Sequence, residues 1–135
     1  DDVRFLIPEV DLGIPLAWGG IPRLVREIGP ALTKELVMTC RPFDAAEAKA
    51  AGFLNTVVPV EELDDAVESL AEAVASRPRA AVLATKRHTN AVTEQMVGLS
   101  RSWSDADGLA IALRDPESRA AQEAYLEKLK AKKRP

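Results

Sequence analysis

The sequence IPEVDLGIPLAWGGIPRL occupies residues 7–24 and separates a short β-prone run from a helix. The run, residues 3–7, contains β-branched and aromatic side chains and is closed by Pro8, so we expect a strand there. At the other end, Pro22 suits the first turn of a helix, because that position needs no backbone N–H. The stretch is therefore predicted to be a loop that joins a strand to a helix.

Two further signals mark the limits of the helices that follow. Gly29 can take the left-handed conformation that ends a helix, and Pro30 can start the next one. Asp44 and Glu47 have the spacing of a capping box, in which Asp44 accepts the amide three residues on and Glu47 reaches back. We expect the helix after this box to end at Gly52.

The second half of the chain has the pattern of successive helices. From Glu61 onward, acidic residues occupy a helix start, where negative charge is favourable. Apolar residues then recur with helical spacing at Leu63, Val67, Leu70 and Val74. We predict that this helix ends near residues 77–78 and that others span residues 79–93, 95–113 and 116–132.

The predicted strands are too few for a sheet. Besides residues 3–7, only residues 55–58 read as a strand, which Pro59 closes. Two short strands cannot bury a face by themselves, because three or more strands or a covering layer are generally needed. Either further strands come from polypeptide outside this sequence, which does not begin with Met, or both strands lie at the edge of a mainly helical domain.

The composition excludes several classes of protein. Of 135 residues, 47% are hydrophobic and 29% charged, which is typical neither of a disordered chain nor of a membrane-embedded one. A net charge of −3 removes the electrostatic case for nucleic-acid binding. No apolar run approaches the roughly 20 residues that cross a bilayer. We therefore expect a cytoplasmic protein that binds neither nucleic acid nor membrane.

The chain has one cysteine, Cys40, and one histidine, His88. These two residues can form neither an internal disulfide nor a structural zinc set. His88 lies in a polar stretch that is typical of a solvated helix face. We therefore expect no bound metal and no catalytic triad.

The order of these features resembles one protein family. Residues 7–24 resemble the loop and helix start of the enoyl-CoA hydratase/isomerase, or crotonase, family. Later pieces in the family's order and spacing are residues 28–31, 35–39, 45–59 and 84–86. No single piece is specific, but their ordered series is. The likeness covers nearly the whole chain and, by this comparison, only the C-terminal half of a family member.

The resemblance implies an α/β fold of stacked β-β-α turns, a ββα superhelix, followed by a helical region that builds trimers. This chain would hold the mostly helical C-terminal half, with few short strands. Residues 1–60 would be the last part of the core and residues 61–135 the helical oligomerisation region. Many alanines and few aromatic residues agree with a homo-oligomer, either a trimer or a dimer of trimers.

The resemblance places Glu9 at the position of the family's general acid/base glutamate. A carboxylate suits that position, because a proton must move to or from the carbon next to the thioester carbonyl. Family members stabilise an enolate-like intermediate with two backbone N–H groups, and the resemblance puts both donors in the half that is absent here. Without the flanking pattern, Glu9 would be interpreted as a surface turn residue.

Other residues match the family's substrate contacts. Ala17 stands where hydratases hold water with a backbone amide. The adjacent Trp18 would either narrow the acyl pocket or pack into the core. Leu109 aligns with an apolar residue of the C-terminal region. Tyr125 and Lys128 match the family's aromatic-x-x-Lys pattern. The resemblance implies that this pattern contacts the adenine and phosphate of CoA bound in the neighbouring subunit. The alternative is that Tyr125 simply packs against its neighbours and Lys128 is solvated.

The sequence therefore predicts an acyl-CoA-processing enzyme of this family, with CoA present only as part of the thioester substrate and no permanently bound cofactor. The leading prediction is an enoyl-CoA hydratase that adds water across a 2-enoyl-CoA double bond, with Glu9 as general acid/base. One alternative is a double-bond isomerase that uses Glu9 alone, to which the bulk of Trp18 points. Another is a non-catalytic helical assembly that lacks the oxyanion donors. We expect the 135 residues alone to be inactive.

Overall fold

The computed structural model describes residues 1–102 and 104–132, over which two short strands pair into a sheet. β1 (Arg4–Phe5) lies antiparallel to β2 (Phe43–Asp44). The first predicted strand is thus present in shortened form. The second, over residues 55–58, is wrong, because these residues stay outside the ladder.

Aromatic packing explains why β2 replaces the expected second strand. The rings of Phe5 and Phe43 stack with centroids 5.0 Å apart, and the ring of Phe53 meets that of Phe5 edge-on at 5.5 Å. In the expected strand, the Val58 carbonyl accepts a hydrogen bond of 2.9 Å from the amine of Asp1. Strand preference depends on such packing more than on the backbone, so the aromatic pair decides the register.

α1 (Gly20–Thr39) consists of two helical segments that meet at Gly29. Gly29 has φ 76° and ψ 164°, a conformation that residues with a Cβ rarely adopt. Just past the break, the Thr33 hydroxyl donates a hydrogen bond of 2.7 Å to the Gly29 carbonyl. The predicted order of helix, stop and second helix is confirmed.

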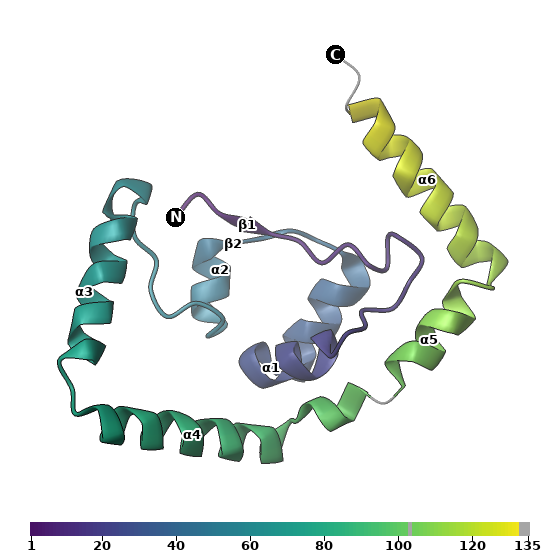
Figure 1. Cartoon of the computed structure of the whole chain (residues 1–135). Helices are drawn as coiled ribbons and strands as arrows, with labels where there is room; N and C mark the ends of the chain where they lie inside the picture. Colours follow the sequence, from purple (N-terminus) through teal and green to yellow (C-terminus); the bar gives the residue numbers. More distant parts are fainter. Residues whose placement is uncertain (103, 133–135) are drawn as a thin grey trace.

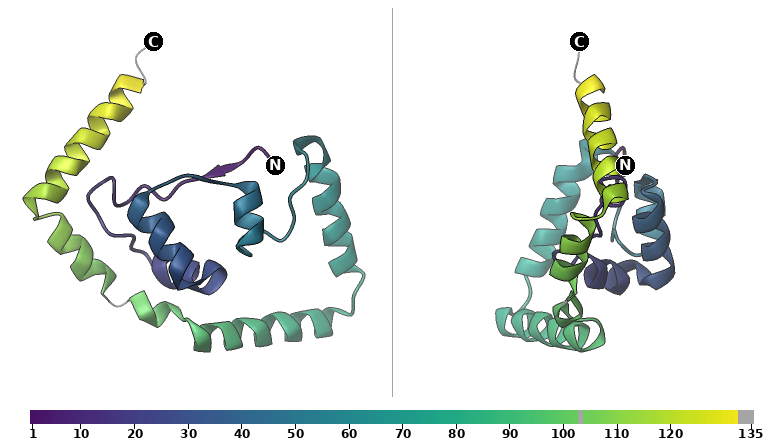
Figure 2. Two further views of the ribbon diagram at one scale, coloured as in Figure 1. Left: turned by 180° about the vertical axis from the view of Figure 1, so that it is seen from behind. Right: turned by 90° about the vertical axis from the view of Figure 1, so that its right-hand side faces the viewer.

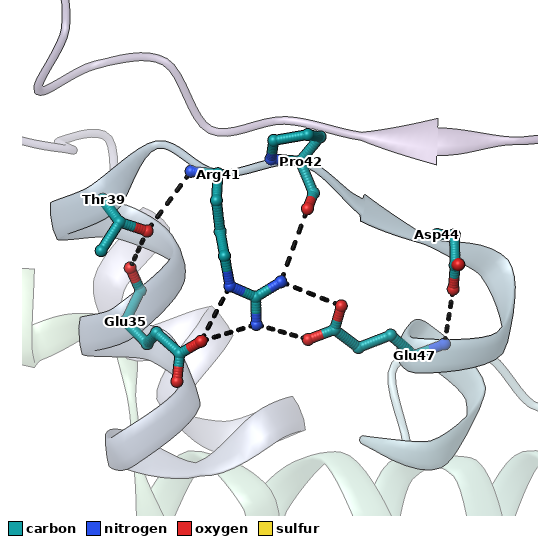
Figure 3. A network of polar contacts seen from close by, with 6 residues as sticks. All are labelled: Glu35, Thr39, Arg41, Pro42, Asp44 and Glu47. Atoms are coloured by element: carbon teal, nitrogen blue, oxygen red, sulfur yellow. Dashed lines mark hydrogen bonds and ion pairs between the residues drawn. The ribbon is translucent and has the colours of Figure 1, made fainter.

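α2 (Ala45–Ala50) begins at the predicted cap, where Asp44 Oδ1 accepts the N–H of Glu47 at 2.9 Å. The Glu47 carboxylate does not reach back to complete the capping box. The Arg41 guanidinium donates instead to both carboxylate oxygens, at 2.9 and 2.5 Å (Figure 3). The prediction that Glu47 reaches back to the cap is therefore wrong. The physical reason is that a bidentate charge-assisted pair is stronger than a single bond from a neutral amide.

The hydrophobic core lies between α1, α2 and the two-stranded sheet. Its buried members are Leu36, Phe43 and Ala48. The half-buried apolar side chains packed around them are Phe5, Ile7, Ile28, Leu32 and Leu54. In the described part of the chain, this core draws on no helix that follows α2.

The later helices form an open arc around this core (Figures 1 and 2), which we call the helical arc. It consists of η1 (Val60–Glu62), α3 (Leu63–Ala75), α4 (Arg79–Met96), η2 (Leu99–Ser102), α5 (Asp105–Ala112) and α6 (Pro116–Lys132). α3 and α6 lie at its two ends (Figure 1). Most side chains of α3 and α4 are exposed, so the arc presents a large uncovered surface.

Three helix predictions in the arc are confirmed and one is wrong. The first confirmed helix is α3, which ends at Ala75, slightly before the expected residues 77–78. Helices stand where residues 79–93 and 116–132 predict them, but residues 95–113 do not form one helix. α4 ends at Met96, because Val97 leaves the helical region with φ −144° and ψ 85°. Gly98, a poor helix former, follows directly, and the chain resumes as η2 and α5.

Candidate active site

The loop that carries Glu9 is folded tightly onto itself and onto α6. The Glu9 carbonyl accepts the N–H groups of Leu12 at 3.1 Å and Ile14 at 3.0 Å. Gly13 has φ 71°, and a Cβ on it would overlap the backbone of Ser118 in α6. Only glycine therefore allows this loop to approach the last helix so closely.

A buried thiol ties the same loop to the end of α1. Asp11 lies two residues after Glu9, and its N–H donates a hydrogen bond of 3.3 Å to Cys40 Sγ. The Cys40 thiol in turn donates to the Val37 carbonyl, with the two atoms 3.6 Å apart. Cys40 thus has a local structural role, and the loop is held from two sides.

The Glu9 side chain is half-buried, and its Oε2 atom is fully shielded from solvent. Within the described residues this oxygen has no hydrogen-bond partner. Buried polar atoms are nearly always paired, so an unpaired carboxylate oxygen requires an explanation. Interactions within the described chain therefore leave this oxygen of Glu9 unused.

A pocket of about 400 Å³ lies beside the loop that follows Glu9. Its lining residues are Ala17, Trp18, Gly19, Ser102, Asp105, Ala106 and Leu109. The three predicted substrate-binding residues Ala17, Trp18 and Leu109 therefore meet at one place, although they come from the loop and from α5. Glu9 is not among the lining residues.

Ala17 and Trp18 differ sharply in their exposure. Ala17 is buried, whereas Trp18 is 71% exposed and has a left-handed backbone with φ 57°. Within the described chain, the indole does not pack into the core. The ring stands at the pocket wall instead, where it can limit what enters.

Two polar residues of the pocket carry no motif that singles them out in the sequence. Asp105 Oδ2 accepts the N–H of Gly19 at 2.8 Å, although the two residues are 86 positions apart. Ser102 lies one turn earlier in the chain and lines the same pocket. The one available signal is the i, i+4 spacing of Asp105 and Leu109, which puts both side chains on one face of α5.

A second pocket, of about 580 Å³, lies between the chain start and α6. Tyr125 and Lys128 both line it, together with Leu6 and Asp11. Tyr125 is half-buried and Lys128 is exposed. The structure thus brings the two predicted CoA-binding residues together, opposite residues of the same chain that neighbour Glu9.

Over the residues described, a metal cluster and a membrane-spanning helix are both absent. No group of three or more His, Cys, Asp or Glu side chains there is placed to hold a metal ion. None of the described helices combines the length and the apolar character that a membrane crossing requires.

Comparison with known proteins identifies the family. The family model described as enoyl-CoA hydratase/isomerase matches residues 1–133. The chain belongs to this family. The match of the enoyl-CoA hydratase/isomerase family model extends over nearly the whole chain, well beyond the loop that carries Glu9.

Individual relatives agree. The chain is 36% identical over 131 residues to a crotonyl-CoA hydratase of Syntrophomonas wolfei, covering 96% of this chain and 50% of the relative. It is 33% identical over 127 residues to a methylmalonyl-CoA decarboxylase of Escherichia coli, covering 93% of this chain and 49% of that protein. The chain spans about half the length of these curated relatives.

A solved structure supports the fold. An enoyl-CoA hydratase/isomerase from Pseudoalteromonas atlantica T6c superposes with a TM-score of 0.77 and 26% sequence identity, covering 93% of this chain and 50% of that one. The predicted crotonase-type α/β fold, mostly helical here with few short strands, is confirmed.

Proposed function

We propose that this chain supplies the proton-transferring group of an enoyl-CoA hydratase. The observation that carries the proposal is the shielded Glu9 Oε2, which has no hydrogen-bond partner among the described residues. Family membership supports it, because the relatives include a protein named crotonyl-CoA hydratase.

In the proposed reaction, the Glu9 carboxylate takes a proton from water while the water oxygen adds to the far carbon of the double bond. The electron pair of that bond moves toward the thioester carbonyl, so negative charge develops on its oxygen. The protonated Glu9 carboxyl then returns this proton to the carbon next to the carbonyl, which completes the addition of water. The backbone donors that would stabilise the charged oxygen are expected in polypeptide that this chain does not contain.

The first pocket suits the acyl end of such a substrate, and the second suits the CoA end of a substrate bound in the neighbouring subunit. Ala17, Trp18 and Leu109 offer a mainly apolar wall to the acyl group. Tyr125 offers a face for the adenine ring, and Lys128 offers a point charge for phosphate. The homo-oligomeric state, the cytoplasmic location and the assignment of residues 61–135 to oligomerisation stay predictions.

Double-bond isomerisation is the second candidate function. Trp18 favours it, because a large exposed ring at the pocket wall reduces the room for a water molecule beside the substrate. An isomerase needs only one carboxylate to move a proton between two carbons, and Glu9 alone can do so. Product analysis with a 3-enoyl-CoA and a 2-enoyl-CoA substrate distinguishes the two reactions.

Glu9→Gln in the complete protein tests the proposal. We expect hydration of crotonyl-CoA to fall by about 10³-fold or more, because the amide cannot take a proton. Glu68→Gln is the matched control, since Glu68 is an exposed carboxylate on α3, away from both pockets. Normal turnover by the Glu9→Gln variant would exclude Glu9 as the acid/base.

A further inference from the structure

One hydrogen bond joins the helical arc to the loop at the acyl pocket. The Gly19 N–H donates to Asp105 Oδ2 at 2.8 Å, in a partly buried position. A bond from an amide to a carboxylate is charge-assisted and about twice as strong as one between neutral groups. This contact therefore constrains where α5 lies relative to the loop.

The loop backbone at Trp18 and Gly19, which this hydrogen bond holds, has an unusual conformation. Trp18 has φ 57° and Gly19 has φ 71°, so two successive residues are left-handed. The first of them is not glycine, and a bulky side chain adopts this conformation only when its surroundings impose it. An acceptor fixed to the Gly19 N–H is one such surrounding group.

The same carboxylate lies in the pocket wall. Asp105 and Leu109 are one helical turn apart on α5, and both line the pocket with Trp18. One face of α5 thus supplies both Asp105, which accepts the hydrogen bond from the loop, and Leu109, an apolar side chain of the pocket wall. A change in the Asp105 contact would move Trp18 relative to Leu109 and so change the width of the pocket.

We propose that Asp105 is a positioning residue that sets acyl-chain selectivity by holding the Gly19 amide. The carboxylate acts through the backbone of the loop and takes no part in proton transfer. The selectivity part of this inference rests on the proposed function, in which the pocket holds the acyl group.

Kinetics on the complete protein test selectivity. For Asp105→Ala, we expect the ratio of kcat/KM for crotonyl-CoA to kcat/KM for 2-decenoyl-CoA to change by about fivefold or more. Asp105→Asn keeps an acceptor oxygen and should restore the ratio to within about twofold of wild type. Asp107→Ala, which removes another carboxylate from the first turn of α5, should leave the ratio unchanged. A purely structural loss scales both substrates equally, so an unchanged ratio in Asp105→Ala would overturn the selectivity role.

Hydrogen exchange at the Gly19 amide provides a readout that does not depend on activity. We expect the exchange rate of this amide to rise by about tenfold or more in Asp105→Ala, to rise less in Asp105→Asn, and to change little in Asp107→Ala. Unchanged exchange in Asp105→Ala would overturn the positioning role itself. If wild type hydrates neither substrate but Gly19 exchange rises as expected, the proposed function fails and the Asp105 contact stands.

Discussion

Arg41 links α1 to α2 through its guanidinium group. Besides both oxygens of Glu47, it contacts the carboxylate of Glu35, with Nε to Oε1 at 2.8 Å (Figure 3). Hydrogen bonds from Arg41 hold the pKa of Glu47 below its ordinary value of 4.5. Since 35% of each of the two side chains is exposed, solvent screens the pair and its contribution to stability is modest.

The sign of this pKa shift predicts a pH dependence. A carboxylate whose pKa is lowered by folding stabilises the protein above its unfolded pKa, and this stabilisation is lost as pH falls through the folded pKa. We expect Glu47→Gln to lower Tm by a few degrees at neutral pH, with the difference shrinking as pH falls below 4.5. Thermal scans of wild type, Glu47→Gln and the exposed control Glu68→Gln at several pH values check this. A difference that grows toward acid would contradict it.

At the scale of elements, Gly29 separates the two segments of α1 by its backbone alone. No atom lies within 4 Å of the position that a Cβ would take, so a substitution there meets no steric clash. We expect Gly29→Ala to lower the free energy of unfolding by about 1–3 kcal/mol, because alanine is strained at φ 76°. Urea unfolding measures this. A neutral or stabilising result would mean that the two segments can join differently.

Local signals in the sequence predict elements well where the cause is local. Gly29 and the Asp44 cap depend on a few neighbouring residues, and both predictions are confirmed. β2 consists of two residues and exists because Phe43 stacks on a ring 38 positions earlier, at Phe5. Likewise, the contact between Asp105 and Gly19 spans 86 positions. Such pairings arise from tertiary packing, and no local pattern contains them.

At the scale of the whole molecule, the apolar stripe of α3 is uncovered. Leu63, Val67, Leu70 and Val74 match the predicted helical spacing, yet their exposures are 53%, 58%, 64% and 49%. An apolar face of this kind is usually buried against another surface. The prediction of a homo-oligomer offers one such surface.

Sedimentation of the complete protein tests this prediction. We expect an oligomer at micromolar concentration, and Leu70→Asp should shift the population toward smaller species because it places a charge in the stripe. Glu72→Gln, a polar change on the same helix, is the control and should sediment like wild type. Wild type that sediments only as a monomer would count against the prediction. If Leu70→Asp lowers Tm without changing the mass, the stripe is covered within one subunit.

The contact between Gly13 and Ser118 makes the loop that bears Glu9 depend on α6. Deleting α6 would remove the surface on which this loop rests, as well as Tyr125 and Lys128. Truncation of the C-terminus should therefore impair catalysis even with substrates too small to need the lost side chains. Under the proposed function, a proteolytic cut before α6 should therefore slow proton transfer at Glu9.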